Sequence, residues 1–333
     1  MAFSATVQPT WLLELLACPR DGRALETSEG MLECSRGHRY PVIGGIPVIL
    51  ITGVQPTHHA FIETLELVAR SPLRALPVTD AGGSNDVHPF VEQEIVGTCG
   101  LMYRAVRRPL PRYPIPRFPL GGGRGRALLD VGCNWGRWTI AAAMAGYRAV
   151  GIDPSIKAVA AGRSVSQQLG QDVGYVVGDA RHLPFRDDAF DVTFSYSVFQ
   201  HFDKEDVREA LHEVARVLRR KGTALVQMAN VFGARSALNR LRQVVTSDQN
   251  SFRVRYWTPG ELIRCFTETI GETRLSVDGF FSLNARIEDV DLLPSRYKAV
   301  VLSSEWLRRL SERIWWLVYV ADSLWVYATK GVP

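Results

Sequence analysis

Ala127-Leu-Leu-Asp-Val-Gly-Cys-Asn-Trp-Gly136 is the stretch that indicates the fold most strongly. Its first five residues are mostly apolar and predict a buried strand, which the glycines at 132 and 136 end in a turn. Helical spacing of apolar residues resumes at 138–145. The sequence therefore predicts a strand, a tight turn and a helix in succession, with glycines that let a ligand approach the backbone.

Strand and helix patterns alternate along the chain after this turn. Further strands are predicted at 149–152, 173–177, 191–196, 222–228 and 323–329. Helices are predicted at 157–169, at 207–218, from Thr258 onward and at 297–316. Such alternation predicts right-handed βαβ units and a mostly parallel sheet with helices on both faces, the doubly wound α/β class.

Carboxylates follow two of these strands. Asp153 lies about twenty residues after the glycine turn, where an acid can accept both hydroxyls of a ribose. Asp179 stands in Gly178-Asp-Ala-Arg-His182, at the end of the next strand. Because parallel strands end at one edge of a sheet, the turn and both carboxylates are expected to line one crevice.

Together these motifs resemble the class I S-adenosylmethionine-dependent methyltransferases over residues 90–330. The resemblance implies a Rossmann-like sheet of seven strands, with S-adenosylmethionine as cofactor. It places Gly132 and Gly136 beside the methionine part, Asp153 at the ribose and Asp179 at the adenine, with Asp130 ordering the turn. The candidate cofactor residues are Asp130, Gly132, Cys133, Asn134, Gly136, Asp153, Pro154, Asp179, Ala180 and Ser195.

The turn departs from the family pattern at one position. Asn134 stands where many members have a glycine, but asparagine tolerates left-handed backbone geometry, so the turn can still form. A dinucleotide fold that binds NAD is the alternative. It is disfavoured because the glycine spacing does not match Gly-x-Gly-x-x-Gly.

Methyl transfer is an in-line displacement, so the protein must align the acceptor and take up a proton when the acceptor carries one. His201 is the candidate general base, because its ordinary pKa is near neutrality and it follows the strand at 191–196. Tyr196 is the second candidate catalytic residue. In the alternative interpretation, His201 caps this loop or packs beside the cofactor.

Residues 1–52 predict a separate small module. Cys18 and Asp21, followed by Cys34 and His38, form two ligand pairs on turns, a spacing typical of zinc ribbons. The module resembles the small zinc domain that activates tRNA and protein methyltransferases, which implies a structural zinc ion. Asp21 replaces the cysteine of those relatives, and a metal-free remnant that docks on the catalytic domain is the alternative.

Composition is that of a globular protein, with 46% hydrophobic residues and a net charge of +5 over 333 residues. No apolar run is long enough to span a bilayer and no export signal is evident, and the scattered cysteines argue against a disulfide framework, so we expect a cytoplasmic protein. We interpret 53–89 as a linker and 90–333 as the methyltransferase domain, with a late helical insertion at about 285–320.

The favoured acceptor is a small molecule, a metabolite or natural-product intermediate. Trp306, Trp315 and Trp316 in the late insertion suit a lid over an apolar acceptor, and aromatic residues near the later strands could form a pocket with arginines at its mouth. The alternative is an RNA base methyltransferase that uses the ribbon and a cluster of arginines. These are Arg104, Arg107, Arg108, Arg112, Arg117, Arg124 and Arg126. A non-catalytic module that binds the cofactor and a protein partner is the third hypothesis.

Overall fold

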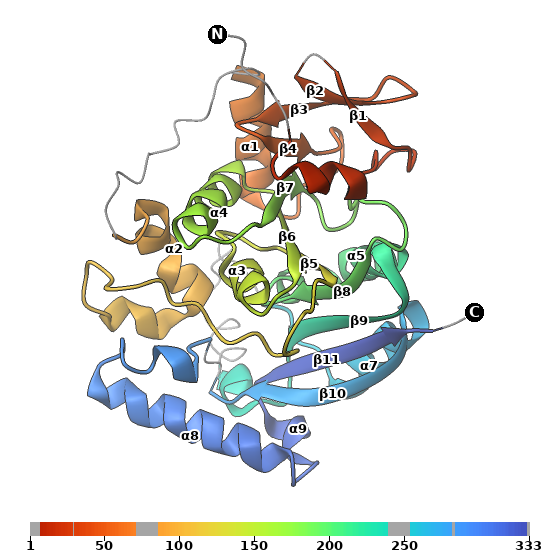
Figure 1. Ribbon diagram of the computed structural model, residues 1–333. Coiled ribbons are helices and arrows are strands. Elements are labelled where there is room, and N and C mark those ends of the chain that lie inside the picture. Colours follow the sequence, from red (N-terminus) through yellow and green to blue (C-terminus); the bar gives the residue numbers. More distant parts are fainter. Residues whose placement is uncertain (1–6, 29, 71–85, 239–253, 282–283, 332–333) are drawn as a thin grey trace.

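The computed structural model describes residues 7–28, 30–70, 86–238, 254–281 and 284–331. Figure 1 shows their arrangement. The strands are β1 (Leu25–Ser28), β2 (Met31–Cys34), β3 (Arg39–Ile43), β4 (Ile46–Ile49), β5 (Ala127–Val131), β6 (Arg148–Asp153), β7 (Gly174–Gly178), β8 (Phe190–Ser195), β9 (Leu218–Ala229), β10 (Gly271–Gly279) and β11 (Ser323–Lys330). The α-helices are α1 (His59–Arg70), α2 (Pro89–Cys99), α3 (Arg137–Met144), α4 (Ile156–Gln168), α5 (Lys204–Val217), α7 (Pro259–Thr269), α8 (Ser295–Ser311) and α9 (Leu317–Val320). The short 3-10 helices are η1 (Thr10–Leu15), η2 (Leu101–Ala105), η3 (Phe199–His201) and η4 (Ile287–Asp289).

The strands form one mixed sheet of eleven, in the order β1-β2-β3-β4-β7-β6-β5-β8-β9-β11-β10. Neighbouring strands run parallel from β4 to β9 and antiparallel at both ends. The predicted Rossmann-like α/β class is confirmed, but the predicted count of seven strands is wrong for the whole sheet. The four additional strands are N-terminal, and β4 joins the sheet through Val48 and Ile49, which pair with Val177 and Gly178 of β7.

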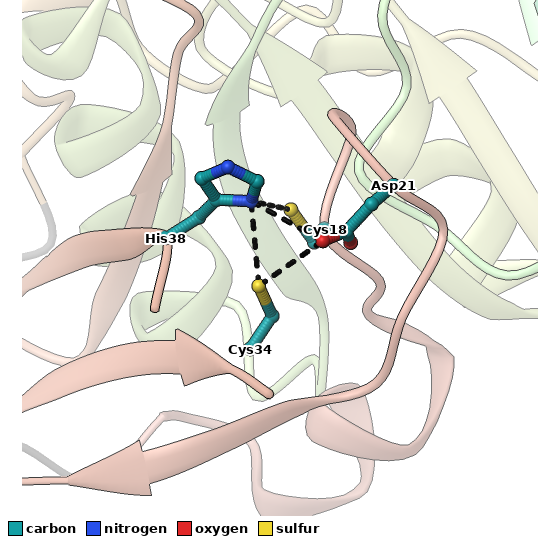
Figure 2. Close-up of side chains that lie close together, drawn as sticks. All are labelled: Cys18, Asp21, Cys34 and His38. Carbon is teal, nitrogen blue, oxygen red and sulfur yellow. Dashed lines mark hydrogen bonds and ion pairs between the residues drawn. The ribbon is translucent and has the colours of Figure 1, made fainter. Parts of the chain in front are cut away.

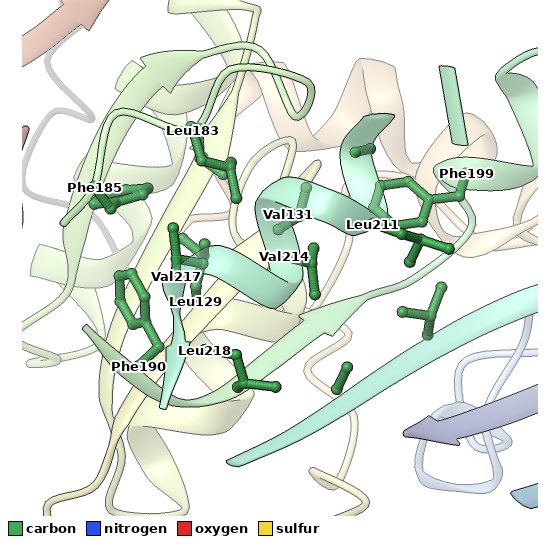
Figure 3. Close-up of a cluster of buried hydrophobic side chains, with 14 of the residues drawn as sticks. Leu129, Val131, Leu183, Phe185, Phe190, Phe199, Leu211, Val214, Val217 and Leu218 are labelled. Atoms are coloured by element: carbon green, nitrogen blue, oxygen red, sulfur yellow. The ribbon is translucent and has the colours of Figure 1, made fainter. Parts of the chain in front are cut away.

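Alternate residues of the central strands pack on opposite faces of the sheet. Leu128 and Phe194 pack with α3 on one face. Leu129 and Val131 pack on the other face, against a cluster that includes Leu211 of α5 (Figure 3). Burial on both faces explains why these strands read as continuous apolar runs in the sequence.

The N-terminal strands share the core of the parallel sheet. Leu12, Leu16 and Leu32 belong to the same buried cluster as Val176 and Phe185. A module of this size has too little apolar surface to form a core alone, so it gains stability by joining a larger one. The division into domains at residue 52 stays a prediction, because the apolar core continues across it.

A local signal predicted where α7 begins. Helix α7 begins with the predicted capping box, in which the Thr258 hydroxyl accepts from the Glu261 amide and the Glu261 carboxylate accepts from the Thr258 amide. The predicted helix at 297–316 overlaps α8, but α8 ends earlier than predicted, at Ser311, and the short α9 begins only at Leu317.

The proline-rich segment 108–119 contains neither helix nor strand, as its composition predicts. Much of the predicted linker is ordered, because α1 packs against the end of β6, where the Thr64 hydroxyl donates to the Pro154 carbonyl at 2.7 Å. The remainder of that linker, 71–85, lies outside the described residues. Within the ranges that the structure describes, no helix has both the length and the apolar character needed to cross a membrane.

Candidate functional site

The turn between β5 and α3 is pinned to the end of β6. The amides of Gly132 and Cys133 both donate to the carbonyl of Ile152, at 2.8 and 3.0 Å. The Asn134 amide donates to the Asp153 carboxylate at 2.9 Å. Asn134 adopts the left-handed conformation expected of it, with φ of 47°. The glycine turn and Asp153 are therefore joined by hydrogen bonds into one unit.

Two positions in the turn have room for glycine alone. A Cβ atom on Gly132 would lie 2.3 Å from the Val198 side chain, and one on Gly136 would lie 2.1 Å from the Tyr175 hydroxyl oxygen. Both glycines also have positive φ, 76° and 78°. The loop after β8, which carries Val198, therefore lies directly on the glycine turn.

Asp130 and Asp153 are the acidic groups of this unit. Burial raises the pKa of Asp130 to about 7, with a smaller contribution from the nearby Asp153 charge, although the Thr139 hydroxyl donates to Asp130 at 2.7 Å. Burial also raises the pKa of Asp153 to about 6, against the opposing effect of amide hydrogen bonds from Ser155 and Asn134. Each Asp153 oxygen accepts one of these amides and keeps a further lone pair for a ligand hydroxyl.

Asp179 lies at the end of β7, next to β6, but its carboxylate is engaged by Arg181. The Arg181 amide and guanidinium donate to both Asp179 oxygens, and the pair is buried. Arg181 also donates to the Gln55 carbonyl and pairs with Asp206 of α5. Sequence reasoning missed Arg181, although a cation two residues after the acid is a visible signal.

The end of β8 carries the predicted catalytic residues. The Ser195 hydroxyl donates to the Val131 carbonyl, and Tyr196 donates to Asp278 at 3.2 Å. Burial raises the pKa of Tyr196 well above its ordinary value, so its phenol remains neutral and acts as a donor. His201 is the last residue of η3 in the same loop. Its imidazole Nε2 atom lies 3.4 Å from the side-chain amide nitrogen of Gln200.

A cavity of about 930 Å³ opens on the α3 face of the sheet, between α8, β10 and residues 117–121. Its inner wall contains Trp138, Trp325, Asp278 and Arg286, and its outer part contains Arg309, Trp315 and Tyr319 of the late insertion. The Arg286 guanidinium lies over the rings of Trp138 and Tyr196, at 5.1 and 4.9 Å, and pairs with buried Asp278 at 2.7 Å. Sequence reasoning missed Asp278, an acid next to Val277 near the buried end of β10.

The four predicted metal ligands come together at the N-terminal strands (Figure 2). The His38 Nδ1 atom lies 3.4 Å from the sulfur of Cys18, 3.4 Å from that of Cys34 and 3.3 Å from the Asp21 carboxylate. All four ligand atoms lie within 4.8 Å of one another. Tetrahedral zinc with ordinary bond lengths separates a sulfur from a nitrogen ligand by about 3.6 Å, so the spacing fits a zinc ion.

Turns on both sides of the cluster have the geometry of metal-binding knuckles. The Gly22 amide donates to the Cys18 carbonyl and the Gly37 amide to the Cys34 carbonyl, both at 2.8 Å. Both glycines have positive φ, 71° and 80°. These turns present the two cysteines to the same point in space.

Comparison with known proteins finds matches around the glycine turn and the strands beside it. The model of the methyltransferase domain family matches residues 129–226. Over these residues the chain is therefore similar to a methyltransferase domain. The uncharacterised methyltransferase YcgJ of Bacillus subtilis is 35% identical over 100 residues, which are 30% of this chain and 39% of YcgJ. Demethylmenaquinone methyltransferase of Lactiplantibacillus plantarum is 37% identical over 99 residues, 28% of this chain and 40% of that enzyme.

Among solved structures, an S-adenosylmethionine-dependent methyltransferase of Methanosarcina mazei has a TM-score of 0.47 at 16% identity, covering 66% of this chain and 100% of that one. The chain matches about two fifths of the length of the two curated relatives. The matched methyltransferase domain contains the glycine turn, Asp153, Asp179 and the end of β8. The cavity residues of β10 and α8 and the N-terminal ligand cluster lie outside it.

Proposed function

We propose that this protein transfers a methyl group from S-adenosylmethionine to a small organic acceptor. One observation supports the proposal most strongly. The glycine turn after β5 is hydrogen-bonded to the acid at the end of β6, because the Asn134 amide donates to the Asp153 carboxylate. Bound cofactor would supply an electrophilic methyl group on a sulfonium. The remaining requirements, binding, alignment and proton transfer, fall to residues of the chain.

In this proposal Asp153 binds the ribose through its unused lone pairs, with Pro154 beside it, and the turn from Gly132 to Gly136 accommodates the methionine part. We place Cys133 and Ser195 beside the methionine part of the cofactor as well. Asp179 is held by Arg181, so we assign it chiefly to shaping the turn at Ala180 that borders the adenine. The fit to the cofactor rests on the unused lone pairs of Asp153 and on the glycine turn beside it.

We assign Tyr196 to positioning and His201 to proton uptake. Neutral Tyr196 already donates its proton to Asp278, whose other oxygen is paired with Arg286. Neither group of that network is available as a base. We therefore assign proton uptake to His201, a titratable side chain of the loop that follows β8.

The cavity beside Tyr196 supports a small acceptor. Its volume of about 930 Å³ lies within the range of about 300–1,000 Å³ usual for small-molecule sites. Aromatic walls with a few charged groups suit an apolar molecule that carries a polar end. Demethylmenaquinone methyltransferase, which matches part of this chain, is named for a small organic acceptor.

RNA is the second candidate acceptor, favoured by exposed arginines. Arg104, Arg107, Arg117 and Arg124 are exposed, with no ion pair among the described residues. Arg108 and Arg112 instead pair with Glu92 and Asp289 and are occupied in holding the fold. We therefore rank RNA below a small molecule.

One experiment separates these candidates. The protein is incubated with cofactor labelled in its methyl group and a cell extract, which is then divided into organic-extractable, nucleic-acid and protein fractions. We expect label in the organic-extractable fraction, whereas label in RNA would favour the second candidate. Calorimetry that finds heat with NAD and none with S-adenosylmethionine would overturn both.

We also propose that Cys18, Asp21, Cys34 and His38 hold one structural zinc ion. The chemistry of the four donors and their mutual spacing support this assignment. No step of methyl transfer involves the metal. Its role in this proposal is to fix the turns that precede β1 and β3.

A further inference from the structure

The late helices expose an unusual number of large apolar side chains. Half of the exposed large apolar residues found in the described part of the chain fall between 302 and 320. They are Leu302 (51%), Trp306 (63%), Trp315 (73%), Trp316 (52%), Tyr319 (46%) and Val320 (42%). We call these six residues the tryptophan patch. A concentration of exposed large apolar side chains of this kind indicates an interaction site.

The patch is the outer face of a helix whose inner face is buried. Leu302, Trp306 and Arg309 recur at helical spacing along α8 and are exposed, whereas Val301 and Ser304 on the opposite side are buried. Helix α9 follows beside the end of α8, at the lower edge of the molecule in Figure 1. Both helices carry exposed apolar side chains, Leu302 and Trp306 on α8 and Tyr319 and Val320 on α9.

The charge around the patch is positive. Residues 295–313 contain five basic and two acidic side chains, a net charge of +3. Glu305 and Glu312 are taken up by ion pairs with Arg308 and Arg309. Arg296, Lys298 and Arg313 have no ion pair within the described residues. Indole rings together with basic residues are the composition of surfaces that rest in the headgroup layer of an anionic bilayer.

The patch also borders the cavity that we propose for the acceptor. Trp315 and Tyr319 belong to the patch and also line the cavity, together with Arg309. A molecule that leaves a bilayer at the patch would meet the cavity mouth without crossing water. Association of two copies through this face would bring two net positive surfaces together, which repulsion disfavours.

We propose that the tryptophan patch docks the protein on the surface of an anionic lipid bilayer, and that the acceptor is a lipid-soluble molecule that enters the cavity from there. The second half of this proposal rests on the proposed methyltransferase activity. The docking itself does not.

The test is flotation of the full-length protein with two kinds of vesicle. One consists of phosphatidylcholine alone, and the other also contains about 30% phosphatidylglycerol, because anionic lipids attract basic segments. We expect binding to the anionic vesicles that weakens as salt is added. The double variant Trp306→Ser, Trp316→Ser should reduce the partition coefficient about tenfold or more, because it removes two exposed indole rings from the patch. Neither residue lines the cavity, so the cavity itself is left intact. Leu101→Ser, at an equally exposed site elsewhere (61%), is the matched control and should bind as the wild type does.

Two results would overturn the proposal. One is equal flotation of wild type and double variant. The other is a wild-type dimer in solution that the double variant abolishes, since the patch would then be a protein interface. Calorimetric titration with S-adenosylmethionine on the same samples tests the two proposals separately. If the wild-type protein does not bind the cofactor, the proposed activity is refuted. If it does not float with anionic vesicles, the docking is refuted.

Discussion

Gly136 and Tyr175 are packed so closely that a Cβ atom on Gly136 would lie 2.1 Å from the Tyr175 hydroxyl oxygen. Tyr175 lies in β7, and its hydroxyl is also hydrogen-bonded to Ser166 of α4 at 2.9 Å. The turn of the methyltransferase domain is thus fitted against a neighbouring strand and helix. Any side chain at position 136 must displace this buried tyrosine.

Gly136→Ala should therefore weaken both folding and cofactor binding. Gly125 is a matched control, because its φ of 77° is similar but nothing lies within 4 Å of its Cβ position. We expect Gly125→Ala to cost about 1–2 kcal/mol from backbone strain, and Gly136→Ala about 1–3 kcal/mol more from overpacking. Urea unfolding measures the difference, and equal losses in the two variants would contradict the packing argument.

Asp130 predicts a pH dependence of stability. Burial raises its pKa from 3.8 to about 7 in the folded protein, so the folded state binds the proton more tightly than the unfolded state. Its contribution is therefore favourable below the unfolded pKa and is lost as pH rises toward 7. Relative to Asp130→Asn, which cannot ionise, the wild type should lose about 3 kcal/mol of unfolding free energy between pH 5 and 8. Parallel curves for the two cofactor-free proteins would disprove the shift.

Asp278→Asn should be strongly destabilising, because it leaves the largely buried Arg286 guanidinium without its partner. Breaking such a pair costs about 3–5 kcal/mol. Asp291→Asn is the control, since Asp291 is 65% exposed in its ion pair with Arg112, and exposed pairs contribute about 1 kcal/mol or less. Denaturant titration should separate the two variants clearly; a similar small loss in both would show that Arg286 is solvated.

His201→Ala should lower turnover about 10²–10⁴-fold at saturating acceptor while leaving cofactor affinity unchanged. His212 lies exposed on α5, so His212→Ala is expected to retain full activity. Calorimetry gives the cofactor affinity and a methyl-transfer assay gives turnover. Near-normal turnover of the His201 variant would favour its alternative role as a packing residue.

Metal analysis of the purified protein should find about one zinc ion per chain, as a closed set of four ligands holds. Cys34→Ala should remove it, whereas Cys265→Ala, in a buried cysteine of α7, should not. Loss of zinc should also lower the unfolding temperature, because the N-terminal strands share the sheet. Zinc far below one ion per wild-type chain would support the metal-free remnant.

Local patterns predicted much of the parallel sheet and the candidate cofactor turn. The strands at 127–131 and 173–177 are apolar on both faces, and the Thr258 capping box is a short-range signal, so each could be read without tertiary information. The four N-terminal ligands could likewise be found from spacing, because each pair lies within one turn.

Long-range pairings could not be predicted in this way. The hydrogen bond from Tyr196 to Asp278 joins residues 82 positions apart, and Arg286 reaches that pair from a different segment again. The pairing of β4 with β7 was missed for the same reason, since nothing in residues 46–49 names the strand that they join. The cavity depends on these contacts and so was anticipated only as a set of aromatic residues.

The pairing of β4 with β7 affects how readily the protein would aggregate in concentrated solution. A parallel sheet that stopped at β7 would expose a row of unused backbone donors and acceptors, to which another chain could attach. With β4 in place, that margin is closed from within the same polypeptide, and the strands that follow it outward are short. Removal of residues 1–52 would expose the edge of β7, so we expect this segment to protect the molecule against strand-mediated aggregation.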